Sequence, residues 1–155
     1  MQYWLMKTEP ETFSWEDLKN CPDRREHWDG IRNYLARNHM RQMAKGDLVF
    51  IYHSVVKPPA IAGIARVVRT AYPDHTQFDP SAKYYDPKSA PDNPRWDMVD
   101  VQAFKELDRP IPITELKKIP GLENMALFRM SRLSVQPVTA EEWERITALR
   151  KIEAL

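Results

Sequence analysis

The chain has 155 residues, long enough for one domain to bury a hydrophobic core without disulfides or a structural metal. Its 23 basic and 22 acidic side chains nearly cancel, which excludes a polybasic protein that binds nucleic acid through its overall charge. The single cysteine, Cys21, excludes an internal disulfide framework, and no apolar run is long enough for a transmembrane helix. We therefore expect one domain over residues 1–155, no membrane association, and a cytoplasmic location, or a nuclear one in a eukaryote.

Two elements are predicted at the N-terminus. Residues 2–7 are short and aromatic and are followed by a turn signal, which is typical of a first strand. Ser14 and Asp17 have the spacing of a capping box, so a short helix should begin there and end before Pro22.

A polar loop over residues 20–27 should then lead into an unusual mixed cluster, residues 28–34, with the sequence WDGIRNY. A core segment would be apolar, and a solvated loop seldom contains large aromatic side chains, because these need burial or a ligand to stack on. The cluster therefore predicts a binding pocket around Trp28. The alternative is that Trp28 simply closes the bottom of a small core.

The next segment predicts a helix from about residue 33 to 44, with Ala36, Met40, Met43 and Ala44 on one apolar stripe. Residues 24–45 contain six basic and two acidic side chains, so the opposite face is a candidate footprint for phosphate groups. For any single arginine, an ordinary solvated helix face is the simpler explanation. The predicted phosphate contacts are Arg24, Arg25, Arg37 and Arg41.

Two strands should follow and pair with each other. Residues 48–52 are apolar on both faces, as in a central buried strand, and residues 60–68 form a second strand of small residues. Gly63 within it indicates a bulge or a close approach of another group. Residues 72–94 contain five prolines and predict a long surface loop, a kind of segment that is often functional in a compact domain.

The C-terminal part predicts strands at residues 96–107 and 132–138 and a short helix at 114–117, while residues 122–130 give no clear pattern. A capping box and an apolar staple should open a last helix over residues 139–150. Together these elements predict an α+β domain with a strongly bent sheet or a small barrel of about five strands.

Several common chemistries lack support in the sequence. The chain has only four glycines and no glycine-rich phosphate or dinucleotide loop. The four histidines lack the spacing of metal ligands, and Ser54 follows His53 directly, so the two side chains would lie on opposite faces of a strand. Cys21, with His27 or His53 as a base, is a formal nucleophile, but a lone cysteine in a polar loop rarely acts as one. We expect no catalytic residue, no cofactor and no metal.

Six motifs in order resemble those of the EVE domain family. They are YWLMKTEP at residues 3–10, WDGIRNY and ARN at 28–38, GD at 46–47 leading to YHS at 52–54, AGIA at 62–65, YPD at 72–74 and RLSVQPV at 132–138. The resemblance covers nearly the whole chain. It implies a PUA-like fold, a bent β-barrel of about five to six strands with flanking helices, and a pocket that takes a modified base. Thr8, Ile31 and Leu35 stand where many members have Ser, Val and Gln, and Leu35 lacks the amide that would make a polar contact.

If the first strand, the Trp28 cluster and the end of the central strand meet, their side chains should surround one cavity that suits a flat heterocycle. The predicted ligand-binding residues are Trp4, Lys7, Trp28, Gly30, Ile31, Arg32, Asn33, Tyr52, His53, Ser54, Arg132 and Ser134. The predicted function is a non-enzymatic reader that binds nucleic acid, either DNA or RNA, through a modified base. The alternatives are a hydrolase or nuclease that uses Lys7, Glu9 and His53 on modified nucleosides or nucleic acid, and a module that binds a small molecule or a protein.

Overall fold

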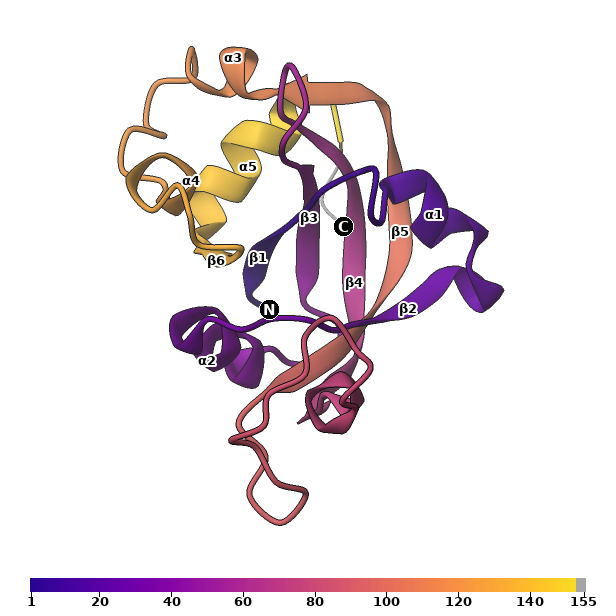
Figure 1. Ribbon diagram of the computed structural model, residues 1–155. Helices are drawn as coiled ribbons and strands as arrows, with labels where there is room; N and C mark the ends of the chain where they lie inside the picture. The colour runs from indigo at the N-terminus through magenta and orange to yellow at the C-terminus, as the bar shows by residue number, and fades with distance from the viewer. Residues whose placement is uncertain (153–155) are drawn as a thin grey trace.

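The computed structural model describes residues 1–152 and consists of one mixed sheet with helices on both of its faces (Figure 1). The expected domain of residues 1–155 therefore includes three residues that lie outside the described range. The six strands have the order β2-β5-β4-β3-β1-β6. They are β1 (Tyr3–Thr8), β2 (Arg25–Trp28), β3 (Leu48–His53), β4 (Ala60–Pro73), β5 (Asp97–Pro112) and β6 (Val135–Val138).

Only the pairing of β1 with β3 is parallel among the strand pairs that the described residues form. The α+β class and the number of strands agree with the prediction. The sheet does not close into a barrel within residues 1–152, because the four-residue strands β2 and β6 stand at its two edges without pairing to each other. Bulges shift the register of β4 against β5 and let these two long strands curve.

The helices are short, and their ends are fixed by side-chain caps where the sequence predicted them. Ser14 with Asp17, and Thr139 with Glu142, both form complete capping boxes, which confirms the two predicted helix starts. The helices are α1 (Trp15–Asn20), α2 (Tyr34–Gln42), α3 (Ile113–Leu116), α4 (Ala126–Arg129) and α5 (Ala140–Ala148), with 3-10 turns η1 (Pro22–Arg24) and η2 (His75–Phe78). None of the helices in residues 1–152 is long and apolar enough to cross a bilayer.

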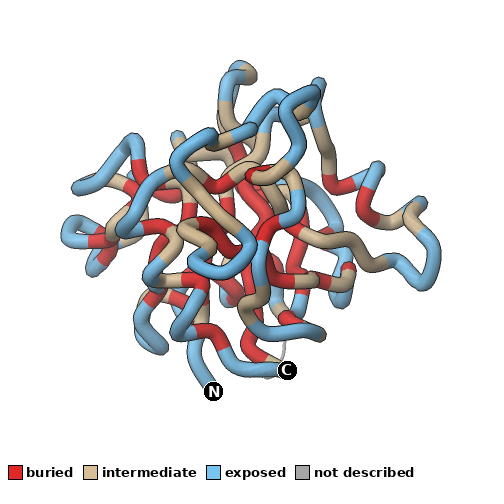
Figure 2. Tube along the Cα trace, turned by 60° about the horizontal axis from the view of Figure 1, so that its bottom comes forward, coloured by how far each residue is buried: buried red, intermediate tan, exposed pale blue. Residues whose placement is uncertain are grey.

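Two hydrophobic cores lie on opposite faces of the sheet, because successive side chains of a strand alternate between its faces. In β3, Val49 and Ile51 join the core under α1 and α2, whereas Phe50 joins the core under α5. The prediction of a central strand buried on both faces is thus confirmed. The buried stretches lie inside a mostly exposed outer chain (Figure 2).

Three expectations about elements need correction. Residues 25–28 form a strand rather than a loop, because β5 supplies hydrogen-bonding partners that no local pattern reveals, with Trp28 opposite Val99. The second helix ends at Gln42, and Ala44 is exposed rather than part of the apolar stripe. The strand predicted to end at residue 68 continues to Pro73, since β5 extends alongside it.

Gly63 confirms the predicted bulge and close approach. The register between β4 and β5 shifts beside it, and a Cβ atom at this position would collide with the indole of Trp15. A side chain at residue 63 would therefore displace α1 from the sheet.

Candidate functional site

A cavity of about 710 Å³ opens where β1, the end of β2 and the loop before β6 meet. Its volume falls within the roughly 300–1,000 Å³ of pockets that take small ligands. It is lined by Lys7, Thr8, Glu9, Thr12, Phe13, Glu26, His27, Trp28, Asp29, Gly30, Ile31, Ser54, Val55, Lys83, Tyr84, Ser131, Arg132 and Ser134. The cavity therefore joins segments from the whole length of the chain.

One wall of the cavity belongs to the Trp28 turn, residues 28–32, which begins at the last residue of β2 and lines the cavity with residues 28–31. Trp28 and Ile31 are each 7% exposed and form part of the apolar floor. The ring of Phe13 meets the Trp28 indole edge-on, with ring centroids 5.9 Å apart. Such contacts hold the indole in one orientation.

Asp74, which is fully buried, fixes the Trp28 turn from behind. Its Oδ2 accepts hydrogen bonds from the Gly30 N–H at 2.8 Å and from Arg32 Nη1 at 3.0 Å. Its Oδ1 accepts from the backbone and the hydroxyl of Thr76. Burial alone would raise the pKa of Asp74, but the bonds from Thr76, Gly30 and Arg32 outweigh it and leave the pKa below its ordinary value. The carboxylate is thus a charged anchor that is satisfied on both oxygens.

Tyr84, from the long loop between η2 and β5, covers the turn from the solvent side. Gly30 has φ +80°, and a Cβ atom there would lie 2.8 Å from the Tyr84 ring, so only glycine allows this packing. Arg32 donates from Nε to the Tyr84 carbonyl at 2.9 Å. Tyr84 remains 39% exposed and offers an accessible aromatic surface at the cavity.

The opposite wall is the Ser131 loop, residues 131–134, together with Lys7 at the end of β1. Lys7 donates from Nζ to the Ser131 carbonyl at 2.6 Å and from its backbone N–H to the Ser134 carbonyl at 2.9 Å. Burial lowers the pKa of Lys7. Arg132 is exposed and forms no ion pair within residues 1–152. This wall therefore presents positive charge to the cavity.

The lining mixes both signs of charge. Lys7, Lys83 and Arg132 are its cations, and Glu9, Glu26 and Asp29 its carboxylates. Such a cavity can hold a polar heterocycle that has both donors and acceptors, while cations at the rim hold an anionic group.

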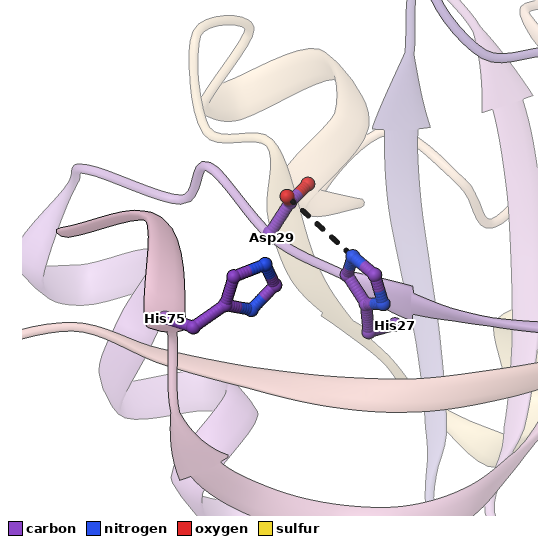
Figure 3. Close-up of side chains that lie close together, drawn as sticks. All are labelled: His27, Asp29 and His75. Carbon is purple, nitrogen blue, oxygen red and sulfur yellow. Dashed lines mark ion pairs between the residues drawn. The ribbon is translucent and has the colours of Figure 1, made fainter. Parts of the chain in front are cut away.

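Three possible metal ligands meet beside the cavity. Ligand atoms of His27, Asp29 and His75 all lie within 4.8 Å of one another, and the ion pair between His27 and Asp29 is drawn in Figure 3. The sequence did not predict this cluster, because residues 27 and 75 are far apart in the chain.

The predicted ligand-binding residues divide into two groups. Those that line the cavity are Lys7, Trp28, Gly30, Ile31, Ser54, Arg132 and Ser134. Those that do not are Trp4, Arg32, Asn33, Tyr52 and His53.

The second group has structural partners instead. Trp4 is buried and donates from Nε1 to Asp47 at 3.0 Å, and Tyr52 lies in the core under α5. His53 accepts a hydrogen bond at Nε2 from the Trp15 N–H, and burial lowers its pKa, so the imidazole is held neutral.

Asn33 and Arg32 act on elements next to the cavity. The Asn33 side chain caps α2 by accepting from the Ala36 N–H, and it lines a shallower pocket of about 340 Å³ that shares Arg132 with the main cavity. Arg32 supports the Trp28 turn through Asp74 and Tyr84 rather than reaching into the cavity.

The predicted phosphate arginines are mostly engaged within the protein. Arg25 pairs with Asp100 at 3.2 Å and Arg41 with Asp97 at 2.5 Å, while Arg37 donates to the Arg95 carbonyl at 2.9 Å. Arg24 is exposed in η1. None of the four lines the cavity.

The sequence interpretation did not single out Phe13, Lys83 or Tyr84 as part of the site. The prediction that the loop over residues 72–94 is functional pointed toward Tyr84 without identifying it. The Gln77 side chain is buried and bonds to the backbone of Asp74 and Trp96, which joins the two ends of this loop.

Comparison with known proteins identifies close relatives. The EVE domain family profile matches residues 2–149. Thymocyte nuclear protein 1 of Danio rerio is 50% identical over 94% of this chain and 71% of its own length, and that of Homo sapiens is 48% identical over 97% and 75%. Of the two locations expected from the sequence, the name of these eukaryotic relatives agrees with the nuclear one and gives no support to the cytoplasmic one.

Solved structures of similar proteins have the same fold as this chain. The human THYN1 protein, in complex with DNA that contains 5-methylcytosine, superimposes with a TM-score of 0.93 at 45% identity, covering 99% of this chain and 100% of that one. A protein from Pseudomonas syringae superimposes with a TM-score of 0.90 at 46% identity, covering 96% and 99% of the two chains.

Proposed function

This chain belongs to the EVE domain family, and on that premise we propose that it is a non-enzymatic reader that takes a modified DNA base into the cavity at Trp28. The observation that supports this proposal most directly is the cavity itself, which has a volume of about 710 Å³, an aromatic floor, and both positively and negatively charged side chains around it. The complex of the similar human THYN1 protein with 5-methylcytosine DNA supports DNA as the partner and methylated cytosine as the first base to test.

The lining suits a base of the cytosine type. Cytosine carries an exocyclic amino group, and carboxylates are the side chains that accept from that group. Glu9 lines the cavity and is exposed, and no hydrogen bond within the described residues engages its carboxylate. The hydroxyls of Ser54 and Ser134, also lining, complete a polar edge.

A methyl group on the base would meet the apolar side of the same cavity. Trp28, Ile31 and Phe13 form that side. Burying one methyl contributes about 0.8 kcal/mol, which is roughly a fourfold preference for the methylated base. A preference of this size is enough to distinguish two strands that are otherwise bound through the same contacts.

The phosphate backbone then contacts the rim. Lys7, Lys83 and Arg132 line the cavity from separate segments and supply local positive charge that the nearly neutral chain lacks overall. Entry of a base requires it to leave its stack, which costs a few kcal/mol and is easiest in a single strand. Rim cations offset part of that cost for modified and unmodified strands alike.

The test is affinity for matched oligonucleotides that contain cytosine, 5-methylcytosine or another modified base, as DNA and as RNA, with the wild type, Trp28→Ala and Tyr84→Ala. We expect wild type to prefer 5-methylcytosine DNA, and Trp28→Ala to lose most of that preference while it still binds unmodified strands. Because Trp28 is 7% exposed, its removal also costs about 3–5 kcal/mol of stability, so affinities are measured well below each melting temperature.

Tyr84→Ala separates stacking from folding, since the ring is 39% exposed and its loss should change stability little.

A folded Trp28→Ala protein that keeps its full preference for the modified strand would show that Trp28 is not part of the binding site. If it weakens all strands in step with its loss of stability, the indole is only a core residue. Finally, mass spectrometry of the recovered oligonucleotides detects any chemical change, because conversion of the bound strand would establish an enzyme in place of a reader.

A further inference from the structure

The cluster of His27, Asp29 and His75 lies at the edge of the cavity and combines two imidazoles with one carboxylate (Figure 3). His27 belongs to β2, Asp29 to the Trp28 turn, and His75 to η2. Each offers one ligand atom, and these atoms all lie within 4.8 Å of one another. The antiparallel pairing of β2 with β5, and of β5 with β4, after which the chain enters η2, brings the two histidines together from distant parts of the sequence.

The surroundings of the His27 ring add a second observation to the closeness of the three ligand atoms. Its Nδ1 lies 2.7 Å from Glu26 Oε1, whose carboxylate also accepts a hydrogen bond from the His27 backbone N–H, and the other nitrogen, Nε2, lies 3.7 Å from Asp29 Oδ2. A carboxylate beside one ring nitrogen, with the other nitrogen facing further ligands, is the arrangement found behind metal-bound histidines.

We propose that His27, Asp29 and His75 bind a divalent transition-metal ion, with zinc as the best match, and that Glu26 acts as the supporting carboxylate of His27. Two imidazoles and one carboxylate select Zn²⁺, Co²⁺ or Ni²⁺ over Mg²⁺, which prefers oxygen ligands and retains its water. This inference does not depend on the proposed reading of a modified base.

The geometry requires only a small closure. Tetrahedral ligands about 2.0–2.1 Å from zinc lie about 3.3 Å from each other, so ligand atoms that now lie up to 4.8 Å apart must approach by at most about 1.5 Å. The His27 and Asp29 side chains are 37% and 39% exposed, and His75 is exposed, so all three side chains reach solvent. The imidazoles of His27 and His75 already lie with centroids 5.1 Å apart, edge to face.

Three protein ligands leave a fourth position open. His27 and Asp29 both line the cavity, so this position lies at its edge. A water molecule or a polar atom of a molecule in the cavity would complete the coordination.

The experiment uses untagged protein of the full chain, with Zn²⁺ measured by calorimetry and Co²⁺ by its visible absorption. We expect one ion per chain and no heat with Mg²⁺. His75→Ala should abolish binding, because it removes a ligand from an exposed position that contributes little to folding. Glu26→Ala should weaken Zn²⁺ binding by ~10–100-fold, the usual effect of removing a partner behind a ligand.

His39→Ala is the matched control, since His39 lies on α2 outside the cluster and should bind Zn²⁺ as the wild type does. Binding that survives in His75→Ala, or that disappears equally in His39→Ala, would overturn the site. Absence of Zn²⁺ and Co²⁺ binding to the wild type would do the same and would leave the cluster as an ion pair between His27 and Asp29.

Discussion

The two walls of the cavity are stabilised in different ways. The Trp28 turn is held by the buried carboxylate of Asp74, which bonds to Gly30, Arg32 and Thr76. The Ser131 loop is held by bonds from Lys7 to two of its carbonyls, and its one cation, Arg132, is exposed. We expect the first wall to set the shape that a base must fit and the second to set charge.

Because the two walls are stabilised differently, changes in them should have different effects on the free energy of unfolding and on the affinity for DNA. Breaking the first wall leaves buried polar groups without partners, so the free energy of unfolding should fall together with selectivity. Changing the second wall alters exposed charge, so affinity should fall with little change in stability.

The largest effect is expected from Asp74→Ala. The change leaves the Arg32 guanidinium, 19% exposed at its side chain, and the Gly30 N–H without their acceptor. Removing one partner of such a pair should lower the free energy of unfolding by about 3 kcal/mol, measured by urea denaturation. Asp79→Ala is the control, because Asp79 caps only the exposed Ser81 turn and should cost far less. Equal losses in both variants would show that Asp74 does not anchor the turn.

Gly30→Ala should cost about 1–2 kcal/mol from the left-handed backbone, and in addition it should displace Tyr84 and lower the preference for the modified base. Gly46→Ala provides the matched control, since Gly46 has φ +95° but no atom within 4 Å of an added Cβ. Both variants should lose similar stability from strain, while only Gly30→Ala loses selectivity in the oligonucleotide assay. Unchanged selectivity in Gly30→Ala would exclude a role for the Tyr84 contact.

Arg132→Ala should weaken the binding of modified and unmodified DNA alike. It should also reduce the slope of log affinity against log salt concentration by about 0.7–0.9, the value for one phosphate contact. Its unfolding free energy should stay within about 0.5 kcal/mol of the wild type, since the side chain is exposed. Lys105→Ala removes an exposed charge outside the cavity and should leave the salt slope unchanged. If Lys105→Ala flattened the slope as much as Arg132→Ala, phosphate contacts would not be localised at the cavity.

The smallest effect concerns the pH dependence at Lys7. Burial lowers the pKa of Lys7, so the side chain loses its charge at a lower pH than the ordinary value of about 10.4. Affinity for DNA should therefore fall as the pH rises through this lowered pKa, and Lys7→Arg, which stays charged, should keep its affinity over the same range. Fluorescence anisotropy with single strands from about pH 7 to 10 measures the ratio of the two affinities. A constant ratio would show that the Lys7 charge does not contact the strand.

The opposite wall responds at acidic pH. Because the pKa of Asp74 is lowered in the folded protein, its contribution to stability is present above the unfolded value of about 3.9 and is lost as the pH falls through the folded pKa. The two walls are thus titrated at opposite ends of the pH scale, which keeps their effects separable in the experiments above.

The sequence by itself determined the elements whose signals are local. The capping boxes at Ser14 and Thr139, the strand at residues 48–52 and the close approach at Gly63 were all predicted from spacing and residue type. The mixed cluster at residues 28–34 also indicated where a cavity wall would lie, because large aromatic side chains beside polar ones are unusual in a core.

Only the tertiary structure decided which distant groups meet. Asp74 stabilises the Trp28 turn, Tyr84 covers it, and His75 joins His27, although each comes from the segment between β4 and β5. Tertiary contacts also give Arg25 and Arg41 ion-pair partners, Asp100 and Asp97 of β5, that counting charges in the sequence could not reveal. Local sequence patterns reveal the periodicity of a helix or strand and the residues at which it begins and ends. The partner of a residue across the sheet depends instead on burial and hydrogen bonding in the whole fold, and the neighbouring residues in the sequence do not specify it.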